Sequence, residues 1–126
     1  MNIPENLYYT GDHEWIKVEG NTGWVGVTDF AQHQLGDIVF VDVASVGDTL
    51  SEGETFGTIE AVKTVSDMYM PIEAEVIEFN DALNSEPELI NKDPYGEGWI
   101  VKVTIADTTK LADLLTPEKY KALVEA

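Results

Sequence analysis

The sequence of 126 residues contains no cysteine and no arginine. Without cysteine the chain can form no disulfide, no thiolate metal site and no cysteine nucleophile. Without arginine it lacks the forked guanidinium donor that proteins favour for binding phosphate and nucleotides. Its apolar runs are only a few residues long, far short of a membrane span. Disulfide scaffolds, zinc–thiolate domains and membrane-spanning helices are therefore excluded.

Positive charge is also scarce in this chain. Seven basic residues, all of them lysine, stand against 24 acidic residues, which gives a net charge of −17 and a pI of about 4.1. Nucleic acid and anionic membranes would repel such a surface, so we exclude both as partners. A hydrophobic content of 44% is enough for one core, and we expect residues 1–126 to form a single monomeric domain.

The N-terminal segment from Met1 to Glu5 has neither the basic stretch nor the apolar stretch of a secretory signal. We therefore expect a soluble protein in the bacterial cytoplasm. The mitochondrial matrix is the alternative if a transit peptide has been removed.

Most of the chain has the pattern of short strands separated by glycine and asparagine turns. The expected strands are Trp15–Glu19, Thr22–Val27, Ile38–Val43, Glu54–Val62, Met68–Phe79 and Trp99–Ile105. Gly20 and Asn21 would connect the first two strands as a hairpin. The apolar alternation changes phase near Ile77, which predicts a bulge or corner of the kind that barrel-like sandwiches need.

Short helices are expected around this β core. Thr28 is placed to cap a helix that ends at Gly36. Segment 85–88 has capping-box spacing, the leucines of segment 107–115 have helical spacing, and a last helix should begin at Pro117. Strands followed by helices predict a mostly β fold, a β-sandwich with helices at its rim.

The sequence is poorly equipped for catalysis. His13 and His33 have no metal-ligand spacing, and a histidine beside carboxylates, as in Asp12-His13-Glu14, is most often an ordinary surface residue. None of the four serines has the flanking glycines of a nucleophile elbow. We therefore predict a protein that has no catalytic residues and binds no metal.

One lysine stands apart from the others. In the 74 residues from Val18 to Asn91, Lys63 is the only basic side chain among 15 acidic ones. It lies between two expected strands, which places its amine at or near a hairpin turn with Glu60 and Asp67 close by. One interpretation is a surface lysine paired with these acids, a contact of little energetic value. The other is a single addressable amine, which suits an enzyme that acylates one lysine.

Segment 60–71, EAVKTVSDMYMP, resembles the lipoylation hairpin of the glycine cleavage system H-protein family. Other segments are similar to that family in the same order, namely 9–15, 26–31, 35–41, 80–83, 87–91 and 94–99. The similarity extends from about Tyr8 to the C-terminal helix. Ala61, Val43-Ala44 and Ala74 depart from the usual residues of the family, but none of them removes the acceptor amine.

The resemblance implies a barrel-sandwich hybrid of the lipoyl/biotinyl type with short helices and a C-terminal helical segment. It implies lipoate in amide linkage to Lys63. The implied carrier takes the aminomethyl group of glycine from glycine decarboxylase, a pyridoxal-phosphate enzyme, to the aminomethyltransferase. Dihydrolipoyl dehydrogenase then reoxidises the dithiol. A lipoate ligase or a lipoyl/octanoyl transferase would attach the lipoyl group.

The resemblance also suggests a groove that shelters the loaded arm. Glu14 and Asp67 are the candidates for holding the protonated amine, and Phe30 and Leu35 for lining an apolar wall. Three alternatives stay open at this point: a lipoyl-relay donor of the same family, a biotin carrier domain, and a lysine-dependent enzyme. In a biotin carrier the lysine is typically flanked by methionines, whereas Val62 and Thr64 flank Lys63 here.

Overall fold

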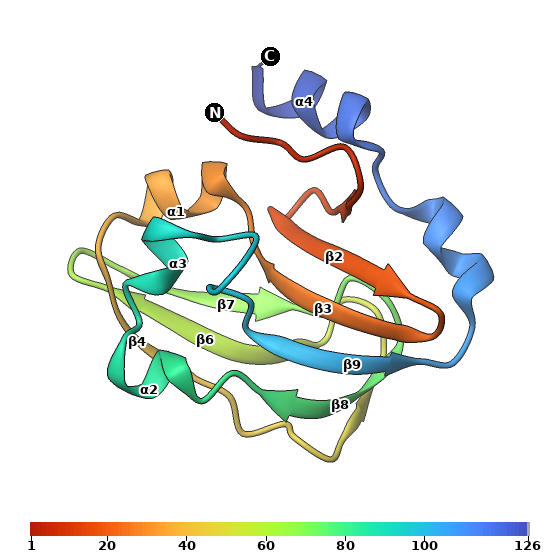
Figure 1. The fold of residues 1–126 in the computed structure, drawn as a ribbon, viewed down its shortest axis with the longest axis horizontal. Helices are drawn as coiled ribbons and strands as arrows, with labels where there is room; N and C mark the ends of the chain where they lie inside the picture. The colour runs from red at the N-terminus through yellow and green to blue at the C-terminus, as the bar shows by residue number, and fades with distance from the viewer. Residues whose placement is uncertain (126) are drawn as a thin grey trace.

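The strands of the computed structural model, which describes residues 1–125, form two antiparallel sheets (Figure 1). The larger sheet has the strand order β1-β2-β3-β9-β8-β5. In chain order its strands are β1 (Tyr8–Tyr9), β2 (Glu14–Glu19), β3 (Thr22–Val27), β5 (Thr49–Leu50), β8 (Ala74–Phe79) and β9 (Val101–Ile105). The smaller sheet has the order β4-β6-β7, with β4 (Ile38–Asp42), β6 (Thr55–Ala61) and β7 (Val65–Tyr69).

The hydrophobic core lies between the two sheets. Ile16, Val25 and Val103 of the larger sheet and Ile59 and Met68 of the smaller sheet belong to one buried cluster. Burying a side chain of this size stabilises a fold by roughly 1.5–3 kcal/mol. The sequence expectation of a mostly β sandwich is confirmed.

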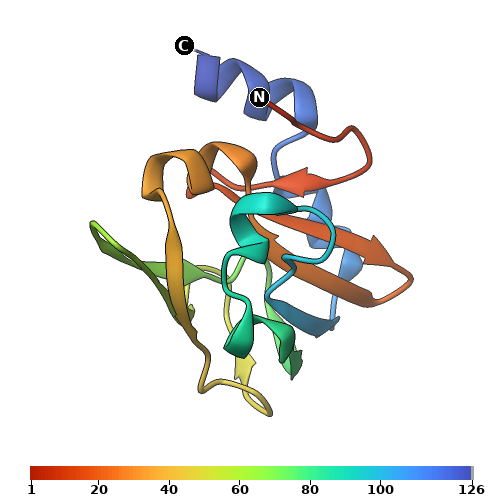
Figure 2. The same ribbon diagram turned by 60° about the vertical axis from the view of Figure 1, so that its left-hand side comes forward.

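Short helices lie around the sheets (Figure 2). They are α1 (Asp29–Leu35), α2 (Ala82–Ser85), α3 (Leu89–Lys92), the 3-10 helix η1 (Thr108–Asp113) and α4 (Pro117–Glu125). Helix α4 and the N-terminal segment lie together at one end of the molecule (Figure 1). None of the helices in residues 1–125 has the length and apolar character that crossing a membrane requires.

Several local predictions are confirmed. Strands β2 and β3 form the expected hairpin, with Glu19 opposite Thr22. The Thr28 side chain accepts a hydrogen bond from the Ala31 N–H, and α1 ends at Gly36. The register shift between Val76 and Glu78 is the bulge expected near Ile77. The final helix begins at Pro117, as predicted.

The prediction of one strand over Met68–Phe79 is wrong. Its first part belongs to β7 in the smaller sheet and its last part to β8 in the larger sheet. Pro71 lies in the connection, and a proline has no N–H to donate to a central strand. Just before it, the Met70 N–H donates to the Glu54 carbonyl at 2.8 Å. The chain changes sheets at this corner.

Two helix predictions also need correction. Ser85 ends α2 instead of opening a helix, and its hydroxyl donates to the Ala82 carbonyl within its own turn. Helix α3 begins after Glu88, which forms no side-chain capping bond. Within the leucine-spaced segment 107–115 the chain forms the 3-10 helix η1 over Thr108–Asp113, capped by the Asp107 side chain, which accepts from the Thr109 N–H.

Candidate functional site

Lys63 lies in a tight turn between β6 and β7, as the sequence predicted. The Ala61 N–H donates to the Thr64 carbonyl at 2.8 Å, and Glu60 pairs with Val65 directly below the turn. The turn projects from the smaller sheet at the left of Figure 1. Within residues 1–125 the exposed Lys63 amine forms no ion pair, so the interpretation as a lysine paired with Glu60 or Asp67 is not supported.

The Lys63 side chain lies over Gly36 at the end of α1. Gly36 has a φ of +81°, a conformation that favours glycine. A Cβ atom placed at Gly36 would come within 3.3 Å of the Lys63 Cε atom. Beside it, the Val62 N–H donates to the Asp37 carbonyl at 3.0 Å. The loop after α1 therefore supports the lysine turn from one side.

Asn91 of α3 holds that supporting loop in place. Its side-chain Nδ2 donates to the Gly36 carbonyl at 2.8 Å and to the Gln32 Oε1 atom at 3.0 Å. Its Oδ1 accepts from the Ile38 N–H at 3.0 Å. Hydrogen bonds thus run from α3 through the loop after α1 to Val62, the residue before Lys63.

We predict that Asn91→Ala loosens the lysine turn as well as lowering stability. Three hydrogen bonds are lost, and we expect the free energy of unfolding to fall by about 1–3 kcal/mol. The Val62 amide should exchange with solvent faster, because its acceptor belongs to the loop that Asn91 fastens. Native-state hydrogen exchange measures this directly.

Asn80→Ala is the matched control for this variant. The Asn80 side chain also forms three hydrogen bonds, to Glu97, Trp99 and Ala82, but in a different loop. It should lower stability by a similar amount and leave exchange at Val62 unchanged. Equal acceleration at Val62 in both variants would show that Asn91 acts only through global stability.

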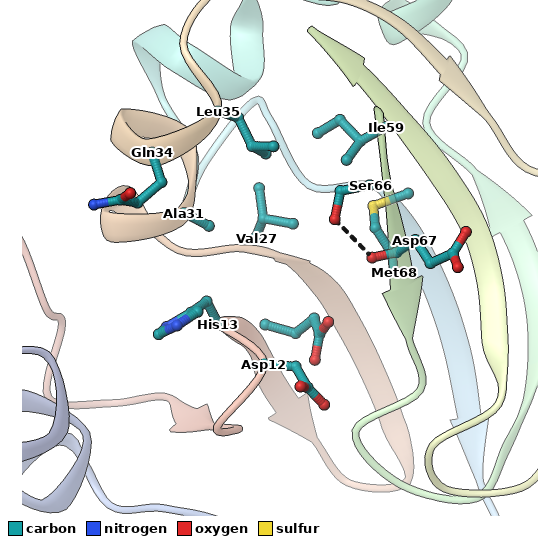
Figure 3. A pocket seen from close by; sticks show the side chains of 11 residues that line it. Asp12, His13, Val27, Ala31, Gln34, Leu35, Ile59, Ser66, Asp67 and Met68 are labelled. Atoms are coloured by element: carbon teal, nitrogen blue, oxygen red, sulfur yellow. Dashed lines mark hydrogen bonds between the residues drawn. The ribbon is translucent and has the colours of Figure 1, made fainter. Parts of the chain in front are cut away.

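A cavity of about 170 Å³ opens next to the same turn. Figure 3 shows Ala31 and Leu35 of α1 on one side, Ile59, Ser66 and Met68 of the smaller sheet on the other, and Asp12 and His13 at one end. Ile59 and Ser66 are opposite each other in β6 and β7, one register step beyond the Glu60–Val65 pair. The cavity therefore begins close to the base of the lysine turn.

Glu14 is the buried carboxyl group of this cavity, with only 3% of the residue exposed. The Thr10 hydroxyl donates to its Oε1 atom at 2.6 Å, and the Tyr69 N–H donates to its Oε2 atom at 3.2 Å. Burial raises the pKa of Glu14 to about 7, although both hydrogen bonds oppose this change. Glu14 is therefore not a solvated surface acid.

His13 forms the rim beside Glu14. It has a φ of +69°, a strained conformation for a residue with a Cβ atom, and burial lowers its pKa. Its Nδ1 atom lies 2.9 Å from the hydroxyl of Tyr120, which in turn lies 2.7 Å from the Thr28 hydroxyl. Helix α4 thus holds His13 in place, and the expectation of an ordinary surface histidine is wrong.

The structure brings only part of the predicted groove together. Glu14 and Leu35 line the cavity. Asp67 also lines it, but its carboxylate points away toward the other face of β7 (Figure 3). Phe30 does not line the cavity; its ring packs against the His13 ring, with ring centroids 4.6 Å apart.

Sequence reasoning missed Asp12, His13 and the apolar side chains of Val27, Ile59 and Met68 at this cavity. The last three belong to alternating strand patterns that indicate a core, so nothing in the sequence separates cavity-lining positions from fully packed ones.

Chemically, the site combines an accessible primary amine with a narrow apolar cavity that contains a carboxyl group. Such a cavity suits a long apolar chain that ends in a cationic amine.

A family model and individual relatives that match this sequence all carry the same description. Residues 7–126 match the family model described as "Glycine cleavage H-protein". A "Glycine cleavage system H protein" of Bacteroides thetaiotaomicron is 60% identical over 124 residues, which cover 98% of both chains. One of Bacteroides fragilis is 57% identical over 126 residues, the full length of both.

A solved structure with a similar fold belongs to a protein of the same description. A crystal structure of a glycine cleavage system H protein from Mycobacterium marinum matches with a TM-score of 0.85 and 38% identity. The match covers 98% of this chain and 100% of the other.

Proposed function

This chain belongs to the glycine cleavage H-protein family, and we propose that Lys63 is the residue that carries its lipoyl group. Members of the family carry lipoate covalently on a lysine, so the chain is a lipoyl carrier of glycine catabolism. The observation that supports Lys63 is its position: an exposed amine without an ion pair among residues 1–125, at the tip of a hairpin beside a cavity.

The residues around Lys63 fit a lipoyl group. The walls provided by Leu35, Ile59 and Met68 suit a methylene chain and a dithiolane ring, both of which are apolar. Gly36 leaves room for the lysine stem to lie against the body of the protein. When bound, the group would supply the disulfide of its dithiolane ring, which is reduced as one sulfur takes up the aminomethyl group of glycine; the dithiol remains after that group is passed on.

We propose that the domain, residues 1–126, works as a carrier without catalytic activity of its own in the bacterial cytoplasm. Its partners would be glycine decarboxylase, the aminomethyltransferase and dihydrolipoyl dehydrogenase, with a ligase or transferase attaching the lipoyl group. The bacterial relatives support the location. The net charge of −17 supports steering toward enzymes with basic rims while the affinity stays low enough for release.

The test of the Lys63 assignment is the intact mass of the protein after co-expression with a lipoate ligase. We expect one lipoyl increment for each chain, and peptide mapping should place it on Lys63. A biotin increment, or a lipoyl group on another lysine, would contradict the proposal.

We further propose that Glu14 holds the cationic amine of the cargo. Glu14 is buried in the apolar cavity, and a nearby cation would favour its charged form. His13 is suited to the same site because its lowered pKa favours the neutral form, which does not repel a cation. Asp67 is less suited to this role, since its carboxylate points to the other face of β7.

Glu14→Gln should therefore release the cargo faster from the loaded carrier. The change keeps the size of the side chain but removes its negative charge. A hydrogen bond to a charged group contributes about 1.5–3 kcal/mol, so we expect a rate of formaldehyde and ammonia release roughly ten-fold higher or more. Lipoylation of Lys63 should be unaffected, and an unaltered release rate would show that Glu14 does not hold the amine.

A further inference from the structure

The outer face of the smaller sheet carries a row of side chains beside Lys63. Phe40 of β4 pairs with Glu60 of β6, and Glu60 pairs with Val65 of β7. The neighbouring row of Val41 and Ile59 is buried and faces the core, so Phe40, Glu60 and Val65 face outward. Val62 precedes Lys63 within the turn, and Val65 is the first residue after the turn.

This face is unusually apolar for a surface. Residues 1–125 contain eight exposed large hydrophobic side chains, and four of them lie in or beside this row: Phe40 and Val65 in the row, Val39 next to Phe40 in β4, and Val62 in the turn next to Lys63. Their exposed fractions are 47%, 52%, 75% and 62%. We call these four residues the hairpin strip. Exposed apolar patches with an aromatic residue commonly mark interaction sites, because water contact with them is unfavourable.

Negative charges surround the hairpin strip. Asp42 and Asp67 flank Thr58 in the next outward row, and Glu60 lies between Phe40 and Val65. All three carboxylates are exposed. The complementary surface is therefore an apolar pocket with a cationic rim. A second copy of this chain does not provide it, since each copy has a net charge of −17.

We propose that the hairpin strip is the docking surface for the enzyme that acylates Lys63, a proposal that rests on the function given above. That enzyme must act on the Nζ atom itself, at the tip of the hairpin. A stable interface covers about 800 Å² on each partner, so contact at Nζ extends over the neighbouring side chains. Enzymes that act at the far end of the lipoyl arm meet their reacting group away from the Nζ atom. Their reaction therefore does not require contact with the side chains around Lys63.

The reaction also fits this geometry. The ammonium group of Lys63 gives up two protons, and its nitrogen forms an amide bond with the acyl carbon of an activated donor, an acyl-adenylate or a thioester. The bond from that carbon to the adenylate or sulfur breaks, and the leaving group takes the electron pair. Docking at the hairpin strip would hold the nitrogen at the activated acyl carbon.

The experiment compares Phe40→Gln with the wild type in lipoylation by a bacterial lipoate ligase, supplied with lipoate and ATP and followed by intact mass. We expect KM for the apo-protein to rise roughly ten-fold and kcat to change little, because docking is weakened and the chemistry is not. Phe40→Leu keeps the position apolar and should restore most of the loss. Ile77→Gln, at the 39% exposed Ile77 of β8, is the matched control and should behave as wild type.

Direct binding gives a second measurement. In a Lys63→Arg background, which keeps the charge and prevents acylation, Phe40→Gln should weaken ligase binding by the same factor. If Phe40→Gln has the same KM and the same affinity for the ligase as the wild type, the docking proposal is overturned. The assignment of Lys63 as the lipoylation site would not be affected. A wild-type dimer that Phe40→Gln dissociates would instead identify the strip as a self-association surface. A failure of wild-type lipoylation would contradict the proposed function itself.

Discussion

Lys63→Arg should abolish lipoylation completely, the largest effect that we expect. Arginine keeps the positive charge, but its guanidinium cannot form the amide that joins lipoate to lysine. No other lysine replaces it, because Lys17 and Lys92, the nearest ones on either side in the sequence, lie outside the hairpin. The intact mass after co-expression with a lipoate ligase should equal that of the unmodified chain.

Lys92→Arg is the matched control for this prediction. Lys92 is an exposed residue at the end of α3 and should be dispensable, so the variant should carry one full lipoyl group. Both variants should unfold at the same denaturant concentration as the wild type, since the Lys63 amine forms no ion pair within residues 1–125. Lipoylation of the Lys63→Arg variant at any other position would overturn the site assignment.

Glu14→Gln should stabilise the protein, and the gain should grow as the pH rises. The pKa of Glu14 is near 4.5 in an unperturbed chain and about 7 in the folded protein. Between these values the folded protein binds more protons than the unfolded chain, so the wild type loses stability as the pH rises. With 1.36 kcal/mol for each pKa unit, the full loss is about 3 kcal/mol. Glutamine does not titrate and avoids this loss.

Chemical denaturation across pH 5.5–8 measures the difference, and this range stays above the pI of about 4.1. Over it we expect the advantage of Glu14→Gln to increase by about 2 kcal/mol and to level off above pH 7. Glu73→Gln removes one negative charge from an exposed position and controls for the effect of net charge. If both variants show the same pH profile, the raised pKa of Glu14 is wrong.

The same burial connects stability with function at Glu14. A carboxyl group that destabilises the empty carrier at neutral pH is compensated when a cation enters the cavity, because the charged form then gains a partner. Glu14→Gln should thus give a more stable protein that releases its cargo sooner. This pattern is typical of binding sites, which give up some stability in the free protein.

The sequence alone determined much of this protein. The alternation of apolar residues and the glycine turns predicted the β2–β3 hairpin and the bulge near Ile77. Thr28 and Gly36 predicted the limits of α1. The isolation of Lys63 predicted a single accessible amine at a turn. These features depend on neighbours along the chain, and their physical causes act over a few residues.

Only the tertiary structure decided the environment of the cavity. Glu14 is buried because Thr10 and the Tyr69 backbone, 55 residues away, enclose its two oxygens. Asn91 reaches Ile38 across 53 residues, and Tyr120 reaches His13 across 107. Which side of β7 the Asp67 carboxylate faces depends on register, which a change of one residue reverses. Burial and register are set by packing between distant segments, and composition or spacing along one chain does not reveal them.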